Sequence, residues 1–370
     1  LRNCINNTYN VMPSRRIRKL VGVSFWIIPF MLLFFLAIIN IGYFNSKGLM
    51  AYSSTNTMQF LEELERESFV TIKDRDAVFG KLERFFADGP GKIQIISDFD
   101  YTLTKFHYDG KMGKSTHGVL AECDMLSEEY HRTARALFDR YYPVETNPSM
   151  SQAEKVPAMV EWWEADHAAL VEHGLTRDVL RSAVAAAGVQ LRAGCVDLFD
   201  WAEGRGVPVL LFSAGLGDVL TEVLAQNLNK PLPSHVHVIS NTMEFDATGK
   251  LVGFPPPLFH VYNKNAGAVK DHPFFGESVQ ARKNILLIGD STGDARMADG
   301  LEGTTVLRIG FLNTKVEERM DTYKGLYDVV LTGDGGLGPL LGLLAGVAAA
   351  ATATATVTAA WPFNQFYTSS

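Results

Sequence analysis

Two aspartates separated by one residue end the apolar run of the segment QIISDFDYTLT, and they are the sharpest chemical feature of the chain. At the end of a strand, alternation directs the side chains of Asp98 and Asp100 to the same side. Their carboxylate oxygens are hard ligands of the kind that Mg²⁺ prefers. One carboxylate can attack phosphorus while the other transfers protons to and from oxygen. Ordinary surface aspartates would not end an apolar strand, so the motif predicts phosphoryl chemistry.

Four further positions complete this predicted site. Ser213 in FSAG, with the backbone amide of Ala214, can donate hydrogen bonds to phosphate oxygens. Lys264 in KNAGAVK is a compact cation that can balance the charge of a nucleophile and a phosphoryl group. In GDSTGD, Asp290 is the third expected metal ligand and Asp294 supports it. Alone, each would be an unremarkable loop residue or solvated lysine.

The elements that must position these residues are short β-rich runs that alternate with amphipathic stretches. Four of the runs are almost continuously apolar, which is typical of strands buried on both faces of a parallel sheet. Polar or glycine residues follow each run, at the edge where open α/β sheets bind ligands. The predicted strands cover residues 92–100, 207–215, 235–245, 284–291, 304–312 and 327–334.

Between the first two strands lie about 100 residues with helical periodicity, over 127–142, 151–174 and 176–188. An insertion that emerges beyond the catalytic strand would cover the site as a cap and exclude water. Residues 48–90 are expected to be mostly helical, and DATGK at 246–250 to form a hairpin turn. The predicted fold class is therefore α/β, a Rossmann-like parallel-sheet core with an inserted helical cap.

The N-terminal region adds a predicted transmembrane helix to this fold. Residues 21–43 carry no charge and exceed the ~20 apolar residues that a bilayer core demands. The basic residues before them predict a single-pass membrane protein with its remaining chain across the membrane. One alternative is that the residues before Met12 are not translated. If the N-terminal segment is not used, the expected compartment is the cytoplasm.

These features give a predicted division of the chain, in which the Ala/Thr-rich C-terminus is a flexible tail. The segments are a basic stretch at 1–19, a membrane anchor at 20–46, the start of the core at 47–104, the cap at 105–192, the rest of the core at 193–345, and the tail at 346–370.

Composition excludes several other classes of protein. The 34 basic and 41 acidic residues give a net charge of -7, which argues against binding of nucleic acid through a basic face. The three cysteines are scattered and show no metal-ligand spacing, so neither a disulfide framework nor a zinc site is expected. The oligomeric state is left open.

The motifs together resemble those of the haloacid-dehalogenase-like phosphohydrolases, because DFDYTLT, FSAG, KNAGAVK and GDSTGD occur in that family's order. Over residues 60–333 the chain is similar to the pyrimidine 5'-nucleotidase family, also called cytosolic 5'-nucleotidase III. The segments YYPVE, EKVPAMVEWW, VISNTMEFDATGKLVGF and ILLIGDSTGDARMADG extend this resemblance through cap and core. It implies Mg²⁺-dependent hydrolysis of nucleoside 5'-monophosphates, typically UMP and CMP and in some members 7-methylguanosine monophosphate.

The resemblance also implies roles for individual residues. Asp98 is the nucleophile and a metal ligand, and Asp100 is the acid/base and a ligand through its backbone carbonyl. Asp290 is the third ligand. The residues implied to bind phosphate are Ser213, Ala214 and Lys264.

In the cap, the resemblance implies that Glu145 contacts the nucleoside and that Trp163 stacks on the base. Without the resemblance, Glu145 would be interpreted as a capping acid in a loop and Trp163 as a core residue. One position departs from the family, which commonly has a serine where this chain has Asp166. A carboxylate near a phosphorylated ligand would repel it or select a donor-rich base.

Two rival functions remain open on the sequence. The same fold could act on a non-nucleotide phosphomonoester such as a phospho-sugar or phosphoserine. A membrane-tethered binding protein could use an inactive phosphatase fold, although every expected catalytic group is present in this chain.

Overall fold

A seven-stranded sheet in the order β1-β11-β10-β9-β2-β5-β6 forms the centre of the computed structural model, which describes residues 54–147 and 149–359. All neighbouring strands run parallel except β1, which pairs with β11 in the antiparallel direction. The strands are β1 Val70–Ile72, β2 Ile93–Ser97, β5 Val209–Leu216, β6 Val236–Asn241, β9 Asn284–Gly289, β10 Thr305–Leu312 and β11 Val329–Thr332.

The six predicted strands are confirmed, and the α/β core with them. In the sheet β2 lies between β5 and β9 and runs parallel to both, so the carboxyl ends of these three strands meet at one edge. The antiparallel edge strand β1 lies inside a region expected to be mostly helical. The predicted turn at 246–250 is confirmed between β7 Glu244–Phe245 and β8 Leu251–Gly253.

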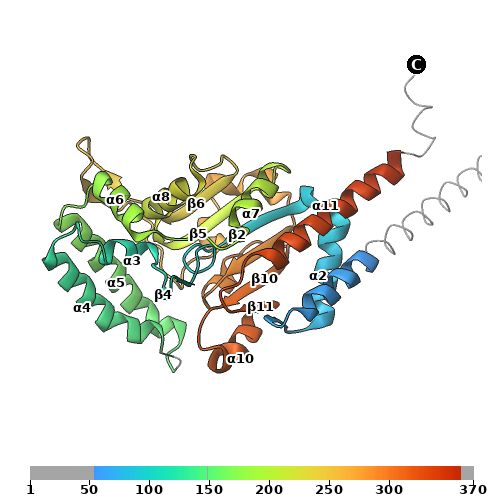
Figure 1. The fold of residues 1–370 in the computed structure, drawn as a ribbon, viewed down its shortest axis with the longest axis horizontal. Coiled ribbons are helices and arrows are strands. Elements are labelled where there is room, and N and C mark those ends of the chain that lie inside the picture. The colour runs from blue at the N-terminus through green and yellow to red at the C-terminus, as the bar shows by residue number, and fades with distance from the viewer. Residues whose placement is uncertain (1–53, 148, 360–370) are drawn as a thin grey trace, which may run out of the picture. The chain divides into compact units, whose positions relative to one another are not determined.

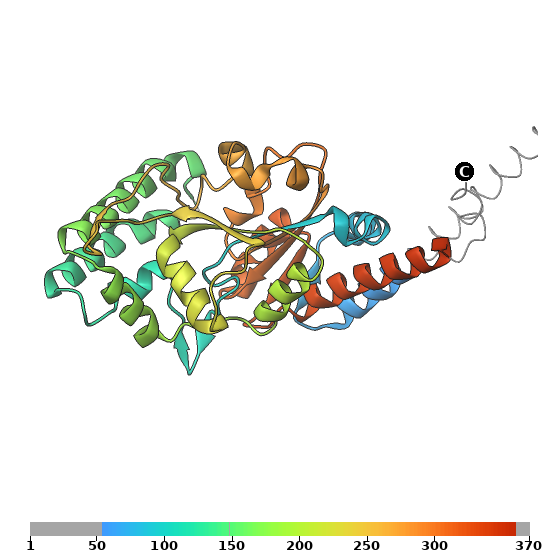
Figure 2. The ribbon, with the colours of Figure 1, turned by 90° about the horizontal axis from the view of Figure 1, so that it is seen from above.

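Helices cover both faces of the sheet, which is why its strands are apolar on both sides. Along β5, Val209 and Leu211 pack into the core on one face, whereas Leu210 and Phe212 pack into the core on the other. Figures 1 and 2 show helices packed on both faces of the sheet. The covering helices are α2 Arg75–Asp88, α7 Cys195–Glu203, α8 Gly217–Leu228, α9 Glu277–Gln280, α10 Val316–Leu326 and α11 Gly338–Ala359.

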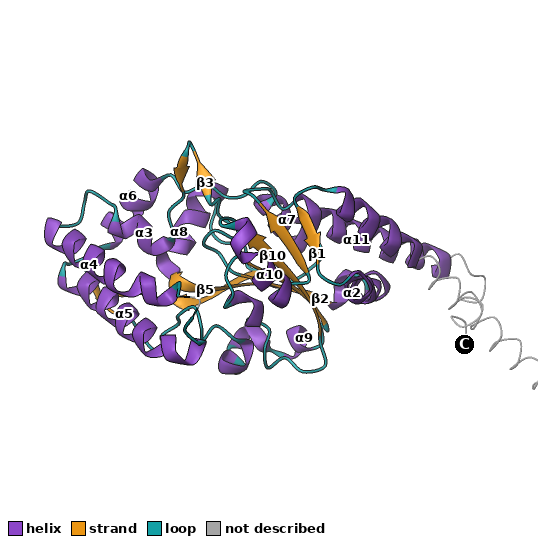
Figure 3. Ribbon diagram, turned by 90° about the horizontal axis from the view of Figure 1, so that it is seen from below, coloured by secondary structure: helices purple, strands orange, loops and turns teal. Residues whose placement is uncertain are grey.

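The insertion between β2 and β5 forms a helical cap at one end of the sheet (Figures 1 and 3). Ser127 and Ser151 cap the starts of its two long helices, and Ser151 forms a reciprocal capping box with Glu154. The cap helices are α3 Thr116–Ala121, α4 Glu128–Glu145, α5 Gln152–Glu172 and α6 Arg177–Ala187, preceded by the small hairpin of β3 His107–Tyr108 and β4 Lys111–Met112.

The C-terminal region is a helix where the sequence suggested a flexible tail. Helix α11 continues through Ala359, so that expectation is wrong for residues 346–359, and residues 360–370 lie outside the described part. Leu340, Leu343, Leu344 and Val347 are buried on one helical face. Alanine is the best helix former, so an Ala-rich extension continues a helix that this apolar face has already anchored.

The membrane prediction requires correction. No helix within residues 54–147 and 149–359 combines the length and apolarity needed to cross a bilayer. The span expected at 20–46 lies outside the described residues, so the structure does not support the transmembrane part of the predicted fold. An uncharged apolar run satisfies the length requirement for a span, but that requirement alone does not establish insertion.

Candidate active site

The predicted catalytic residues converge at the edge of the sheet where β2, β5 and β9 end. Asp98 follows β2 directly, and its backbone N–H donates to the carbonyl of Ile288 in β9 at 2.9 Å. Ser213 lies in β5, and Asp290 follows β9. Parallel strands bring their carboxyl ends to one edge, where ligands of open α/β sheets bind. The structure therefore brings these residues to one edge of the sheet, as their positions after the predicted strands suggested.

Asp98 is buried, with 5 % of its surface exposed, and it contacts a lysine. Its Oδ1 accepts a hydrogen bond from Lys264 Nζ at 2.5 Å, and its Oδ2 lies 3.2 Å from the hydroxyl of Thr102. Burial raises the pKa of Asp98 to about 7, although the positive charge of Lys264 opposes that rise. A further positive charge beside Asp98 would keep it ionised at neutral pH.

Asp294 links the lysine to the loop after β9. Its Oδ1 lies 2.6 Å from Lys264 Nζ, and its Oδ2 accepts from the backbone N–H groups of Asp290 and Ser291 at 3.1 and 2.8 Å. Burial alone would lower the pKa of Lys264, but the carboxylates of Asp294 and Asp98 raise it overall. The lysine is therefore a fixed cation at neutral pH. A Cβ at Gly289 would lie 2.3 Å from the Asp294 Cβ, so only glycine fits there.

Three carboxylates have the spacing of a cation site. One oxygen from each of Asp98, Asp290 and Asp294 lies within 4.8 Å of the others. Burial and the neighbouring carboxylates raise the pKa of Asp290 well above its usual value. Asp98 and Asp294 are buried and pair with Lys264, and Asp290 is half-buried beside them. The negative charge of these three acids and their oxygen donors fit a hard divalent cation.

The side chain of Asp100 points to the cap instead of joining this group. Its two oxygens accept from the backbone N–H and the hydroxyl of Thr116, at 3.0 and 2.8 Å. The Thr116 hydroxyl in turn accepts from the backbone N–H of Leu216 at 3.1 Å, so its own proton is directed to Asp100. Burial raises the pKa of Asp100 to about 6, against the effect of the Thr116 bonds. The first turn of α3 thus orients the predicted acid/base.

The turn after Ser213 is closely packed around Asp100. Ser213 Oγ accepts from the backbone N–H of Gly215 at 3.0 Å. A Cβ at Gly215 would lie 2.1 Å from the Thr116 hydroxyl and 2.9 Å from Asp100 Oδ2. Glycine at this position is therefore what allows β5 and the start of the cap to approach each other.

The cap contributes two of its predicted residues from α5. Trp163 is buried and donates its indole N–H to the carbonyl of Ala214 at 2.8 Å, which fixes α5 over the predicted phosphate loop. Its neighbour Trp162 is half-buried and stacks on Tyr141. Asp166 follows one turn after Trp163 and is buried.

Glu145 ends α4 at the rim of the cap. Its backbone carbonyl accepts from Lys155 Nζ at 2.7 Å and from the hydroxyl of Tyr262 at 3.0 Å, which joins cap to core. Burial raises the pKa of the Glu145 carboxyl to about 7, and the charge of Lys155 partly opposes this.

A buried arginine not expected from the sequence holds the loop that follows Asp98 and Asp100. Arg192 donates to the carbonyls of Tyr101 and Thr102 at 2.7 and 2.8 Å. It also pairs with Asp334 at 3.0 Å, and its side chain is fully buried. Tyr101 has a φ of 61°, a conformation that costs ordinary residues energy and needs support from its surroundings. Arginines are mostly exposed, so nothing in the sequence marks this one.

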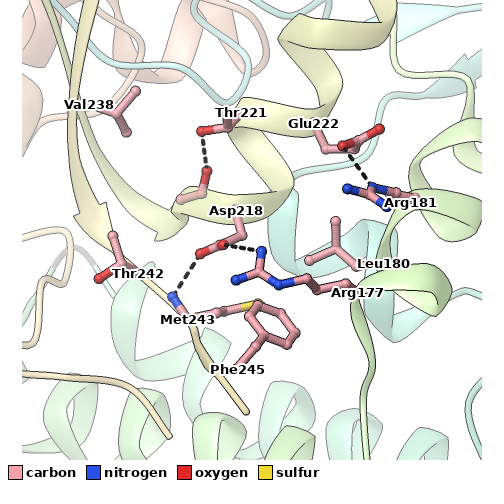
Figure 4. A pocket seen from close by; sticks show the side chains of 11 residues that line it. Arg177, Leu180, Arg181, Asp218, Thr221, Glu222, Val238, Thr242, Met243 and Phe245 are labelled. Atoms are coloured by element: carbon pink, nitrogen blue, oxygen red, sulfur yellow. Dashed lines mark hydrogen bonds and ion pairs between the residues drawn. The ribbon is translucent and has the colours of Figure 1, made fainter. Parts of the chain in front are cut away.

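The cavity of about 290 Å³ shown in Figure 4 lies elsewhere, between α6, α8 and the β6–β7 segment. Its polar side chains pair with one another. Asp218 lies 4.0 Å from Arg177 and accepts from the backbone N–H of Met243 at 2.7 Å, and Arg181 lies 3.8 Å from Glu222. These pairs join α6 of the cap to α8 of the core, and none of the predicted site residues lines the cavity.

Comparison with known proteins places this geometry in context. Residues 101–347 match the family model of pyrimidine 5'-nucleotidase. A mouse protein named 7-methylguanosine phosphate-specific 5'-nucleotidase is 39 % identical over 268 residues, which cover 72 % of this chain and 87 % of the mouse protein. The human protein of the same name is also 39 % identical, over 257 residues that cover 69 % and 85 % of the two chains.

A solved structure is similar over most of the chain. The structure of cytosolic 5'-nucleotidase IIIB bound to cytidine aligns with a TM-score of 0.73 and 31 % sequence identity. The alignment covers 79 % of this chain and 99 % of that one.

Proposed function

This chain belongs to the pyrimidine 5'-nucleotidase family and is a 5'-nucleotidase, and from that premise we propose that it works through an aspartyl phosphate on Asp98. The observation that carries the proposal is the position of Asp98, buried 2.5 Å from Lys264 and grouped with the carboxylates of Asp290 and Asp294. Such an arrangement serves a nucleophile that must approach an anionic phosphate.

The reaction divides into two displacements at phosphorus. In the first, an oxygen of Asp98 bonds to phosphorus, the bond to the nucleoside O5' breaks, and Asp100 gives its proton to that oxygen. In the second, water gives a proton to Asp100 as its oxygen bonds to phosphorus, and the bond to Asp98 breaks. Nucleoside and phosphate leave, and both aspartates return to their first states.

Asp100 donates the proton in the first step and accepts it in the second, because its pKa of about 6 lets this carboxyl exchange a proton near neutral pH. Lys264 balances negative charge beside the nucleophile, and Ser213 with the amide of Ala214 contacts the phosphate oxygens. Arg192 keeps the loop that carries both aspartates in place.

We assign Mg²⁺ as the cation, held by Asp98, Asp290 and the backbone carbonyl of Asp100. When bound, it supplies positive charge to the nucleophile and the phosphate. Asp294 supports the site, because its oxygens already engage Lys264 and two backbone amides.

The substrates in this proposal are nucleoside 5'-monophosphates with UMP, CMP and 7-methylguanosine monophosphate as candidates. The names of the relatives support this class, since they specify 7-methylguanosine phosphate and cytidine. Glu145 and Trp163 are the proposed contacts to the nucleoside. The word cytosolic in the name of the solved relative supports the cytoplasm as the compartment.

Phosphate release from a panel of nucleoside and non-nucleoside monophosphates, with and without Mg²⁺, tests the proposal. We expect turnover of nucleotides only with Mg²⁺ and its loss in Asp98→Asn. An Asp98→Asn enzyme that retains most of its activity would contradict the covalent mechanism, and preference for a phospho-sugar would contradict the nucleoside assignment.

A further inference from the structure

Two buried tyrosines at the end of α10 hold the loop that carries Asp290. The hydroxyl of Tyr323 donates to the backbone carbonyl of Asp290, and the hydroxyl of Tyr327 donates to the carbonyl of Ser291 at 2.5 Å. Only 4 % of the surface of Tyr323 and 1 % of that of Tyr327 is exposed. Buried tyrosine hydroxyls usually find a hydrogen-bond partner. Here the two partners are consecutive residues of the loop after β9.

The peptide between Asp290 and Ser291 is held at both ends. Its carbonyl accepts from the Tyr323 hydroxyl, and its N–H, which belongs to Ser291, donates to Asp294 Oδ2 at 2.8 Å. A peptide unit is planar, so fixing both of its polar ends restricts rotation about the bond that joins it to the Asp290 Cα. The side chain of Asp290 starts from that Cα. Its direction therefore depends on the two hydrogen bonds of this peptide.

The tyrosines are themselves fixed by packing. They lie four residues apart at the end of α10, so they share one face, and their rings stack with centroids 5.6 Å apart. The backbone N–H of Tyr327 donates to the carbonyl of Tyr323 at 2.8 Å. A Cβ at Gly310 in β10 would lie 2.5 Å from the Tyr327 ring, so glycine at that position lets the ring reach the loop. The two hydroxyls are thus held at fixed points.

Asp290 needs this support because its neighbours are acids. One oxygen from each of Asp98, Asp290 and Asp294 lies within 4.8 Å of the others, and like charges so close repel one another until a cation binds. Lys264 holds Asp98 and Asp294, at 2.5 and 2.6 Å. The Asp290 carboxylate accepts a longer hydrogen bond, of 3.3 Å, from Asn313. The position of Asp290 therefore depends strongly on its backbone.

We propose that Tyr323 and Tyr327 are positioning residues for the divalent cation, which keep Asp290 in place before the cation binds. They act through the backbone of Asp290 and Ser291, without contact to cation or substrate. A ligand that is already in place loses less freedom when the cation binds, so the affinity for the cation is higher. The inference rests on the proposed function and deepens it, because it assigns two further residues to the cation site.

The test measures binding of Mn²⁺, which suits the same carboxylate and carbonyl ligands as Mg²⁺, to the full chain without nucleotide. Electron paramagnetic resonance reports the free Mn²⁺. We expect the Kd for Mn²⁺ to rise by about 3- to 10-fold in Tyr323→Phe and in Tyr327→Phe, since each loses one hydrogen bond. In the double variant the rise should reach about 10- to 100-fold.

Tyr130→Phe is the matched control. Tyr130 is equally buried, but it lies in α4 of the cap and packs against His131 and His173. Removing its hydroxyl should leave the Kd for Mn²⁺ unchanged.

Steady-state kinetics separates positioning from general damage to the fold. In the Phe variants the Mg²⁺ concentration for half-maximal activity should rise by the same factor as the Kd for Mn²⁺. The KM for the nucleotide at saturating Mg²⁺ should stay close to the wild-type value, and excess Mg²⁺ should restore kcat. A merely structural role would lower activity at every Mg²⁺ concentration and leave the half-maximal concentration unchanged.

An unchanged Kd for Mn²⁺ in the folded Phe variants would overturn the positioning role. If Tyr327→Phe is too unstable to measure, Tyr323→Phe decides alone, because its hydroxyl bonds Asp290 itself. Wild-type protein that binds no Mn²⁺ and turns over nucleotides without Mg²⁺ would instead refute the proposed function. The two failures are therefore distinguishable.

Discussion

Replacing Arg192 with methionine should destabilise the protein and impair catalysis together. The guanidinium is fully buried and provides the hydrogen bonds at 2.8 and 2.9 Å to the carbonyls of Thr102 and Gly335. Each buried acceptor left without a partner costs about 1–3 kcal/mol, and breaking a buried ion pair costs about 3–5 kcal/mol. Because Asp334 keeps two backbone N–H donors, from Phe106 and His107, we expect a total loss near 3–5 kcal/mol.

Urea unfolding measures this loss, and kcat of the folded fraction measures the effect on the loop. The Arg192→Lys variant keeps the charge but cannot make the same forked set of bonds, so it should recover only part of the stability. A loss below about 1 kcal/mol in Arg192→Met, with normal kcat, would refute the conclusion that this arginine holds the catalytic loop.

Three other predictions address the site itself. Thr116→Val should lower kcat by about 10-fold with little change in KM, because Asp100 loses a bond worth about 1.4 kcal/mol, and Thr116→Ser should restore it in the same steady-state assay. Burial raises the pKa of Asp166 from 3.8 to about 7, so ionising this carboxyl destabilises the folded protein. This destabilisation is absent below about pH 4, where the carboxyl is protonated in both states, and complete above about pH 7. Asp166→Asn should therefore raise the free energy of unfolding at pH 8 by up to about 4 kcal/mol, and equal stability of the two proteins at pH 8 would contradict this. Removing divalent cations with a chelator should abolish phosphate release and lower Tm, since the grouped carboxylates lose their counter-charge; an unchanged Tm on re-addition of Mg²⁺ would count against the metal site.

The convergence of Asp98, Ser213 and Asp290 at one edge of the sheet could be predicted from the sequence because local patterns determine it. Apolar runs mark buried parallel strands, and the residues that follow them meet at one edge. Asp98, Ser213 and Asp290 could therefore be placed together before any coordinates. The convergence of Lys264 with them came from the order of family motifs, because a lysine in a loop carries no signal of burial by itself.

Other features depend on contacts between distant segments and could not be predicted in this way. Strand β1 has only three residues, which are too few to reveal an alternation of apolar and polar side chains. It forms because the edge of β11 is free to pair with it. Arg192 and Thr116 gain their roles from loops that lie 90 and 16 residues away in the chain. Helix α11 extends into the Ala/Thr-rich segment because its first turns pack against the core. The Ala/Thr composition of the later turns gives no sign of this packing.

The most direct measurement of the central claim is chemical trapping of the phosphoenzyme. Wild-type enzyme turning over a nucleoside monophosphate with Mg²⁺ is treated with borohydride, which reduces an acyl phosphate, and its peptides are mapped by mass spectrometry. The mechanism predicts reduction of Asp98 to homoserine, dependent on both substrate and Mg²⁺. Reduction at another carboxylate, with Asp98 unmodified during turnover, would contradict it.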